Sequence, residues 1–452
     1  MDLNQSSVET QDQLLQFRAA LDAGTFNTVR QMLRGMSPGE IAMLIESSPP
    51  RERNLLWQLI PVEEEGEVLL YLNDEIAAHF LRHRDTEEII SAVEGFEADD
   101  FADLLQELPE TVMRRVLESL DDQNRHRIET ILSYSEDEAG GLMSTDIITI
   151  RPDITLDVVL RYLRRHETLP DSTDTLYAVD RAGKLVGALS LTSLLTKDPG
   201  ISVREAMDTD ADAILVDTPT KEVALAFERE DLVTAPVVDE NGLLLGRITV
   251  DDVLDVIREE ADHSLMGMAG LDDYEDTFAP VWKTTRRRAV WLGINLLTAF
   301  LASGVIGLFE GTLEKVVALA ILMPIVASMG GIAGNQTLTL VIRGMALGQV
   351  GSANARWLLN KEMAVGFLNG VMWSLVVGVV ASTWFQDPLL GLVLGAAMII
   401  NLLVAAAAGA SLPLFLKKIG IDPALSGGVI LTTITDVVGF CSFLGLATVL
   451  YT

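Results

Sequence analysis

Five long stretches, without one basic residue and with a single acidic one, fill most of the chain after residue 282. They span residues 289–309, 316–342, 363–386, 388–416 and 423–452. Each reaches the roughly 20 residues with which a helix crosses the hydrocarbon core of a bilayer. A helix also bonds all of its own backbone groups, as lipid requires. The sequence therefore predicts an all-α membrane domain over 285–452 with five transmembrane helices, the last ending near residue 450.

The charge balance separates this membrane domain from an acidic front part. Residues 1–282 carry a net charge of −36 and residues 283–452 one of +4, within −32 for the whole chain. The first 21 residues are polar and contain no apolar signal segment. Basic residues cluster at alternate ends of the spans, which the positive-inside rule makes cytoplasmic; they are Lys283, Arg286, Arg287, Arg288, Arg343, Arg356, Lys361, Lys417 and Lys418. We expect an integral protein of the bacterial cytoplasmic (inner) membrane, with its N-terminus in the cytoplasm and its C-terminus outside.

The one charge within these stretches is Asp436. A carboxylate near the bilayer centre costs about 2.5–3.5 kcal/mol on insertion scales, and such residues usually mark ion or proton paths. Thr432, Thr433 and Gly439 share its side of the predicted helix, which makes a narrow polar face. Because the stretches hold no Lys, Arg or His, a cation is the favoured partner. The alternative is a neighbouring hydroxyl or amide that satisfies the carboxylate.

The second stretch contains Gly-Gly-Ile-Ala-Gly-Asn-Gln, from Gly330 to Gln336, shortly after Pro324. Proline removes a backbone donor, and irregular or polar backbone at membrane depth is tolerated where it lines a cavity. We favour a pathway-lining role for this segment over the alternative, in which its amides only bond neighbouring helices. Helix bonding is the expectation for Asn295 and Asn369 in the first and third stretches.

The acidic front part begins with a repeated helical pattern. Residues 40–60 align with residues 100–120, and each copy has an amphipathic helix, a proline break and a second helix. Shared positions include Ala42 with Ala102 and Pro49 with Pro109. Helical hairpins that recur in this way stack into a small solenoid. The sequence predicts an all-α N-terminal domain over residues 1–135.

A second repeat fills residues 136–258. The segment LYAVDRAGKLVGALSLTSLL matches TAPVVDENGLLLGRITVDDVL, and both copies have the pattern β-α-β-β-α. This arrangement resembles a tandem CBS-domain pair, an α/β module that commonly binds ATP or other adenosyl nucleotides. The second copy keeps Thr249 and Asp252, where such an Asp typically meets ribose hydroxyls, whereas the first copy has Ser190 and Ser193 there. A pair with a purely mechanical role is the alternative.

Residues 259–284 join this repeat to the first span. The sequence from Asp252 onward predicts a long connecting (plug) helix that ends at the membrane, with an interruption near Gly270. A helix in this position can transmit a rearrangement of the cytoplasmic domains to the membrane domain.

Two motifs complete the pattern. One is Gly330–Gln336, and the other is Asp422–Pro423 followed by Thr435, Asp436 and Gly439. Together with the order of a helical domain, a CBS pair, a connecting helix and five spans, they resemble the MgtE family of magnesium channels and transporters. The resemblance covers the whole chain.

The resemblance implies a homodimer with the pore between its protomers. Asp436 of each protomer would hold a hydrated Mg²⁺, with Thr432 and Asn335 supplying polar surroundings. Mg²⁺ prefers oxygen ligands and gives up its waters reluctantly, so its charge of +2 would offset two facing carboxylates. In the absence of the ion, the two like charges would raise one of the two pKa values.

The resemblance also implies a brake operated by cytoplasmic Mg²⁺, which would bridge acidic faces of the cytoplasmic domains and the inner end of the fifth span. The candidates are Asp99, Asp103, Asp231, Asp252, Asp255, Glu260 and Asp422. For any one of them, a solvated surface carboxylate is the alternative. The connecting helix has Asp262, His263 and Ser264 where the family is more acidic, which predicts a weaker regulatory site there.

Three interpretations stay open. The first is a Mg²⁺-selective channel or transporter closed by cytoplasmic Mg²⁺, the second the same architecture carrying Co²⁺ or Mn²⁺, and the third a membrane-anchored CBS nucleotide sensor without transport. Asp436 argues against the third, because an anchor does not need it. The single cysteine, Cys441, leaves no disulfide framework, and no Walker-type loop indicates ATP-driven pumping. We expect neither an enzyme nor a nucleic-acid partner.

Overall fold

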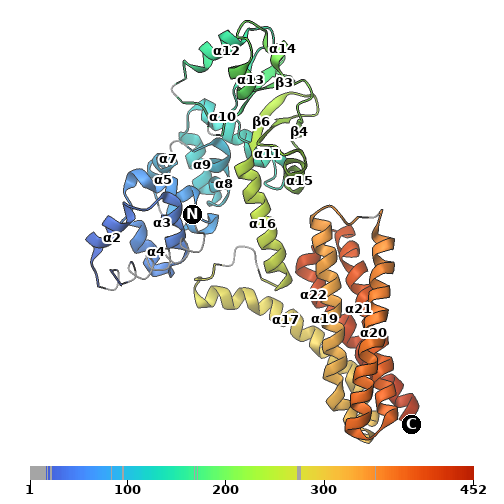
Figure 1. The fold of residues 1–452 in the computed structure, drawn as a ribbon. Helices are drawn as coiled ribbons and strands as arrows, with labels where there is room; N and C mark the ends of the chain where they lie inside the picture. Colours follow the sequence, from blue (N-terminus) through green and yellow to red (C-terminus); the bar gives the residue numbers. More distant parts are fainter. Residues whose placement is uncertain are drawn as a thin grey trace. The chain divides into compact units, whose positions relative to one another are not determined.

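The structure is a computed structural model that describes two compact units. The described residues are 17, 19–20, 23–82, 84–93, 96–166, 168–170, 172–271, 276–351 and 353–451. The first unit comprises residues 1–258 and 276–280, and the second comprises 259–275 and 281–452. The first holds short helices and two small sheets, and the second holds long helices (Figure 1).

The N-terminal helices of the first unit stack as a small solenoid, as predicted. Each helix in the stack packs against the next but one along the chain: α3 packs on α5, α5 on α7 and α7 on α9. Their bounds are α2 Phe26–Leu33, α3 Pro38–Glu46, α4 Pro50–Trp57, α5 Val62–Leu70, α6 Asp74–Leu81, α7 Thr86–Ala92, α8 Ala98–Gln106, α9 Glu110–Ser119 and α10 Asp122–Ile131. The aligned alanines Ala42 and Ala102 are both buried in one continuous core.

The predicted proline breaks separate the paired helices. Pro49 and Pro109 occupy the N-cap positions of α4 and α9, with ψ of 153° and 137°. Proline fixes φ near the value that starts a helix and donates no backbone hydrogen bond, so it starts the second helix of each hairpin cleanly. The repeat read from the sequence is therefore confirmed at the level of two equivalent hairpins, α3–α4 and α8–α9.

The tandem β-α-β-β-α pattern is confirmed as two three-stranded sheets with equivalent topology. In each, the first strand pairs parallel with the second and the second pairs antiparallel with the third. The elements are α11 Ala139–Leu142, β1 Thr149–Ile150, α12 Leu156–Leu163, β2 Thr175–Val179, β3 Leu185–Ser190, α13 Leu191–Thr196, α14 Val203–Ala206, β4 Ile214–Leu215, α15 Thr220–Glu230, β5 Thr234–Val238 and β6 Leu244–Thr249. A register shift falls at the same place in both copies, after Ala178 and after Val237.

The two hairpin turns of the repeat contact each other. Gly183 and Gly242 both have left-handed φ, +82° and +79°, which glycine adopts without strain. Their carbonyl groups accept hydrogen bonds from Leu244 and Leu185 of the other copy, at 3.2 and 3.0 Å. This reciprocal pairing makes the tandem repeat one module rather than two separate sheets.

The connecting segment is helical in its first part only. Helix α16 covers Val250–Met268, and the boundary between the two units falls inside it. Gly270 follows with φ +70°, at the interruption expected from the sequence. Residues 272–275 lie outside the described part, residues 276–280 belong to the first unit, and the next helix starts at Val281. A single helix over 259–284 is therefore not observed, because the chain turns at Gly270.

The second unit contains five helices long and apolar enough to cross a membrane among its described residues. They are α17 Val281–Gly307, α19 Ala318–Ala346, α20 Ala355–Phe385, α21 Pro388–Lys418 and α22 Pro423–Tyr451, with the short α18 Glu310–Lys315 between the first two. Helix α21 is central: 61% of its apolar 18-residue segment is buried, whereas only 6% of the corresponding segment of α17 is buried. It packs against α19, α20 and α22 (Figure 1). The predicted fold class is confirmed.

Candidate functional site

A polar stripe runs along α22 and ends at Asp436. Gly428, Thr432 and Asp436 follow one another at intervals of four residues and therefore share a helix face. Thr432 is exposed, and Gly428 and Asp436 are half-buried. The Thr432 hydroxyl donates to the carbonyl oxygen of Gly428 at 2.8 Å, and the Thr435 hydroxyl donates to that of Thr432 at 3.0 Å. Within the described residues, none donates a hydrogen bond to the Asp436 carboxylate or pairs with it.

Asn335 extends this stripe from α19. Its side chain is exposed, and its Oδ1 lies 3.9 Å from the position that a Cβ on Gly428 would occupy. Gly428 precedes Asp436 by eight residues, or about 12 Å along a helix. The structure thus places Asn335, Thr432 and Asp436 on one line, but it does not gather them around one point within a single chain. We call these residues, with Gly428, the α22 stripe.

The glycines of the Gly330–Gln336 segment divide into two groups. A Cβ on Gly334 would lie 3.0 Å from Leu431 of α22, and one on Gly330 would lie 2.2 Å from the Asn401 amide of α21. Both glycines therefore allow close helix packing. Gly331 differs, because a Cβ there would meet nothing within 4 Å. Together with exposed Asn335, it marks the side of α19 that this chain leaves uncovered.

A second carboxylate, Glu362, lies inside a membrane helix. The sequence placed the third span after it, but α20 begins at Ala355 and buries Glu362 to 4% exposure. Its carboxylate pairs with Lys361 Nζ at 2.7 Å and accepts a hydrogen bond from Thr337 Oγ1 of α19 at 3.1 Å. It borders a cavity of about 230 Å³ between α19, α20 and α21. Apolar residues on both sides of Glu362 could have signalled that the helix starts earlier.

The connecting helix contacts the start of α22 within the second unit. His263 Nε2 of α16 bonds directly to Asp422 Oδ2. The other oxygen of Asp422 accepts the backbone N–H of Ala424 at 2.8 Å. A Cβ on Gly267 would lie 3.5 Å from Ala424, so the helices approach closely here. His263, where the family was expected to be more acidic, thus contacts Asp422 itself. Glu260, on the same helix, is half-buried.

An acidic cluster lies in the first unit where the N-terminal part of α8 faces that of α16. Asp99 is 6% exposed, and its Oδ1 is buried without a hydrogen-bond partner among the described residues. Burial, and then the charges of Asp252, Asp100 and Glu97, raise the pKa of Asp99 well above its usual range. Burial raises the pKa of Asp252 to about 6, although its bonds to Thr249 oppose the shift. The two carboxylates, far apart in sequence, share one electrostatic environment.

Thr249 and Asp252, the predicted nucleotide contacts, bond to each other. Asp252 Oδ2 accepts the Thr249 backbone N–H at 3.0 Å and the Thr249 hydroxyl at 2.7 Å. In α16 the Asp252 carboxylate thus bonds back to Thr249, the residue before the helix, whereas in α13 the hydroxyl of Ser190, before the helix, accepts the Ser193 N–H at 3.1 Å. The two copies of the repeat thus use equivalent positions to start a helix. Asp252 combines this capping bond with a place in the acidic cluster.

The remaining predicted regulatory residues lie outside the cluster's buried centre. Asp103 and Asp255 are exposed, and partial desolvation of the Asp255 carboxyl group raises its pKa. Asp231 is exposed at the C-cap of α15, with left-handed φ of 52°. Over the described residues, no three His, Cys, Asp or Glu side chains are arranged to hold a metal ion. The cluster is therefore a region of concentrated charge, not a preformed cage of ligands.

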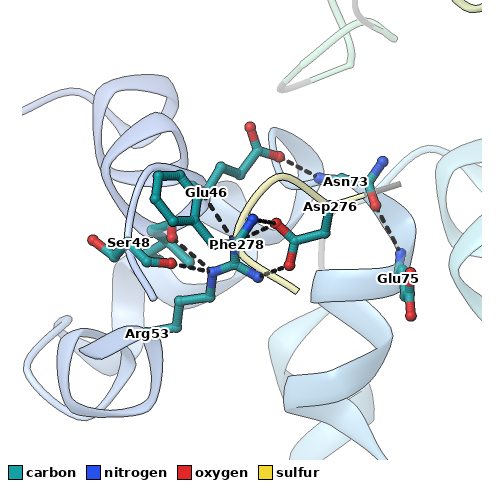
Figure 2. A network of polar contacts seen from close by, with 8 residues as sticks. Glu46, Ser48, Arg53, Asn73, Glu75, Asp276 and Phe278 are labelled. Carbon is teal, nitrogen blue, oxygen red and sulfur yellow. Dashed lines mark hydrogen bonds and ion pairs between the residues drawn. The ribbon is translucent and has the colours of Figure 1, made fainter. Parts of the chain in front are cut away.

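An Arg–Asp clamp, Arg53 with Asp276, ties the segment before α17 to the N-terminal helices (Figure 2). Arg53 Nη1 and Nη2 contact the two oxygens of Asp276 at 2.6 and 2.8 Å. Arg53 also donates to the carbonyl oxygens of Ile45, Glu46 and Ser48, at the end of α3. Burial acts to raise the pKa of Asp276, but the hydrogen bonds and charge of Arg53 prevail and lower it. Sequence reasoning missed this clamp, since nothing local pairs the two residues.

Known proteins resemble the chain along nearly its whole length. The family described as a divalent cation transporter, MgtE, matches residues 323–446, the MgtE intracellular N domain matches 36–137, and CBS domains match 139–200 and 203–259. A magnesium transporter MgtE of Thermus thermophilus is 34% identical over 95% of this chain and 97% of its own length. One of Bacillus subtilis is 29% identical over 97% and 98%. The crystal structure of the cytosolic domain of the Mg²⁺ channel MgtE with ATP shares 34% identity over 54% of this chain and 99% of that one, with a TM-score of 0.48.

Five apolar helices, two of which carry a carboxylate, follow a helical domain and a CBS pair and define a membrane-embedded divalent cation transporter. The near-complete overlap with curated relatives settles the particular family. The chain belongs to the MgtE family of divalent cation transporters.

Proposed function

We propose that this chain carries Mg²⁺ across the bacterial cytoplasmic membrane as a homodimer, with its N-terminus inside and its C-terminus outside. It acts as a transporter and not as an enzyme. The observation that carries the proposal is the α22 stripe. It places Asp436 on a membrane helix, half-buried, and no residue in the described part of the chain bonds to its carboxylate. The names of the relatives support Mg²⁺ as the ion.

The dimer follows from the cost of leaving this stripe uncovered. A carboxylate that faced lipid would be strongly unfavourable. A second copy, related by a two-fold axis, would cover the stripe with the same stripe and bring two Asp436 side chains together. Their mutual repulsion is offset by a divalent ion. Mg²⁺ that kept its waters would be held through them, and Thr432 and Asn335 would supply further oxygen atoms along the approach.

Cytoplasmic Mg²⁺ would close the pathway by binding at the acidic cluster. An ion between Asp99 and Asp252 would offset the burial and the neighbouring negative charges that raise both pKa values. The exposed carboxylates of Asp103 and Asp255 would add weaker contacts. Asp231, Glu260 and Asp422 are further candidates, and the bond from His263 to Asp422 would compete with an ion there.

The CBS pair would bind an adenosyl nucleotide, with ATP as the first candidate, next to Thr249 and Asp252. The family assignment of residues 139–259 supports this site. Because Asp252 also belongs to the acidic cluster, a nucleotide and a divalent ion would both depend on its carboxylate.

Two alternatives are tested by the same experiment. Carriage of Co²⁺ or Mn²⁺ would use the same stripe, since both ions also accept oxygen ligands. A membrane-anchored nucleotide sensor would carry no ion. Uptake into liposomes by the purified chain, with Mg²⁺, Mn²⁺ and Co²⁺ supplied one at a time, separates the three.

Asp436→Ala should abolish selective Mg²⁺ uptake while the protein still inserts and purifies, because alanine removes the charge at no cost in lipid. Asp436→Asn should retain a reduced, less selective flux, since it keeps an oxygen without the charge. Cys441→Ala, exposed on the same helix outside the stripe, serves as the control. Wild-type uptake by a well-expressed Asp436→Ala variant would refute the pore assignment.

A further inference from the structure

Asn401 is a polar side chain at the centre of the second unit. It lies midway along α21, is 1% exposed, and donates through Nδ2 to the carbonyl oxygen of Val326 on α19 at 2.8 Å. Its Oδ1 is buried as well and accepts no hydrogen bond from the described residues. An unpaired buried amide oxygen is unfavourable, and a leucine of similar size would avoid that cost. Space filling alone therefore does not account for an asparagine here.

Two glycines make room for this amide. A Cβ on Gly330 of α19 would lie 2.2 Å from Asn401 Nδ2, and one on Gly439 of α22 would lie 2.8 Å from the same atom. Both separations are shorter than real side-chain contacts. The Cβ on Gly439 would also lie 3.2 Å from Val326 Cγ1. Three helices thus pack closely around one side chain.

This meeting point is linked directly to the carboxylate of the stripe. Gly439 follows Asp436 by three residues, so the two lie within one turn of α22. Thr435, next to Asp436, is fully buried, at 0% exposure. A rotation or shift of α22 at Gly439 must therefore move Asp436. Ion sites depend on ligand positions to within about 0.5 Å, so a small displacement suffices to change selectivity.

We propose that Asn401 is a positioning residue for ion selectivity. Its amide, held by the Val326 carbonyl and enclosed by Gly330 and Gly439, sets the spacing and rotation of α22 against α19 and thereby the place of Asp436. The proposal rests on the function proposed above, since it concerns how the Asp436 site is held. Asn401 does not itself face the α22 stripe as a ligand, because its side chain is enclosed.

A double-mutant cycle with Asn401→Ala and Gly439→Ala tests this assignment in liposomes. Gly439→Ala places a methyl group against the amide and should lower the ratio of Mg²⁺ to Ca²⁺ flux about tenfold, corresponding to about 1.4 kcal/mol. Asn401→Ala should lower the ratio less, because it loosens the contact without a clash. The double variant should recover most of the ratio lost in Gly439→Ala, since the new methyl group occupies the space that the amide vacated.

Gly445→Ala is the matched control on the same helix, because a Cβ there meets nothing within 4 Å. It should leave the flux ratio and the half-saturating Mg²⁺ concentration unchanged. Thermal unfolding of each variant is measured in parallel, because a purely structural role would shift the midpoint and leave the flux ratio intact. If Gly439→Ala does not accumulate in membranes, the test rests on Asn401→Ala alone. An unchanged ratio of Mg²⁺ to Ca²⁺ flux in that variant overturns the proposal.

Additive effects in the cycle also overturn it, since independent sites need not rescue each other. Failure of the transport function itself gives a different result: the wild type carries no Mg²⁺, or Asp436→Ala still does. If the wild type and Asp436→Ala behave as expected while the cycle is additive, only the role of Asn401 is wrong.

Discussion

Asp99 and Asp252 place two carboxyl groups in one largely buried region, where their negative charges are unfavourable. Each lies in the first turn of a helix, where the backbone dipole favours a carboxylate. Burial opposes that preference and prevails, so the pKa of Asp99 is raised well above its usual range and that of Asp252 to about 6. We therefore expect the contact between α8 and α16 to respond to protons and to cations alike.

Acidification should stabilise the Mg²⁺-free protein at this contact. An aspartate in the unfolded chain has a pKa of about 4, whereas the pKa of Asp252 in the folded chain is about 6. Between these two pH values the folded chain therefore keeps a proton that the unfolded chain has lost. Groups with raised acid pKa values contribute stability at low pH that is lost as pH rises through the folded-state value. The thermal midpoint in EDTA should fall between pH 5 and pH 7, and Asp99→Asn should flatten that slope. An identical slope in Asp99→Asn would show that other groups control it.

At the scale of elements, the Arg–Asp clamp is a bidentate link in the first unit that no local sequence pattern predicts. It joins residues 223 positions apart and holds the segment immediately before α17 against α3 and α4. Arg53 also binds three carbonyl groups near the end of α3, where the helix dipole favours a cation. The clamp thus ties the N-terminal helices to the segment that leads into the membrane domain.

Asp276→Asn should loosen residues 276–280 while the N-terminal helices stay folded, because Arg53 keeps its carbonyl partners. Removing one member of a buried ion pair costs about 3–5 kcal/mol, and partial exposure of Asp276 reduces that figure. Hydrogen exchange of backbone amides 276–279 should accelerate at least about tenfold, equivalent to about 1.4 kcal/mol. Asp157→Asn, which breaks an exposed pair with Arg161, is the control and should have no effect. Unchanged exchange at 276–279 would mean that the clamp does not hold this segment.

For the whole molecule, the net charge of −36 on residues 1–282 predicts that divalent cations stabilise the compact form of this part of the chain. If the ion bridges acidic faces, proteolysis near residues 133–138 and 269–271 should slow as Mg²⁺ rises into the millimolar range. Asp99→Asn combined with Asp103→Asn should shift that protection to higher Mg²⁺, because two ligands are lost. The control is the double variant Glu118→Gln with Glu129→Gln, which removes the same number of negative charges from two exposed positions in the same domain. It should leave the protection by Mg²⁺ unchanged.

Monovalent salt at matched ionic strength distinguishes bridging from screening. Screening weakens repulsion between exposed charges but supplies no shared ligand. If salt protects the junctions as well as Mg²⁺ does, bridging is wrong. If Mg²⁺ protects the Asp99 and Asp103 double variant from proteolysis at the same concentrations as the wild type, these two aspartates are only solvated surface groups and do not bind the ion.

The sequence by itself determined the local structure. Five uncharged stretches, the prolines at 49 and 109 and the Asp-x-x-Gly turns each satisfy backbone and solvent requirements within a few residues, so periodicity and composition foretell them. The isolation of Asp436 could be read in the same way, because a charge in an apolar stretch is costly wherever the helix packs.

Only the tertiary structure decided which distant groups meet. Asp99 faces Asp252, Asn401 fits between Gly330 and Gly439, and Glu362 lies inside α20 rather than before it. These choices depend on how closely whole helices approach, and that approach is set by many packing contacts that no short segment contains. The same carboxylate or amide would be a solvated surface group in another packing, so its role follows from the partners and not from its own position in the sequence.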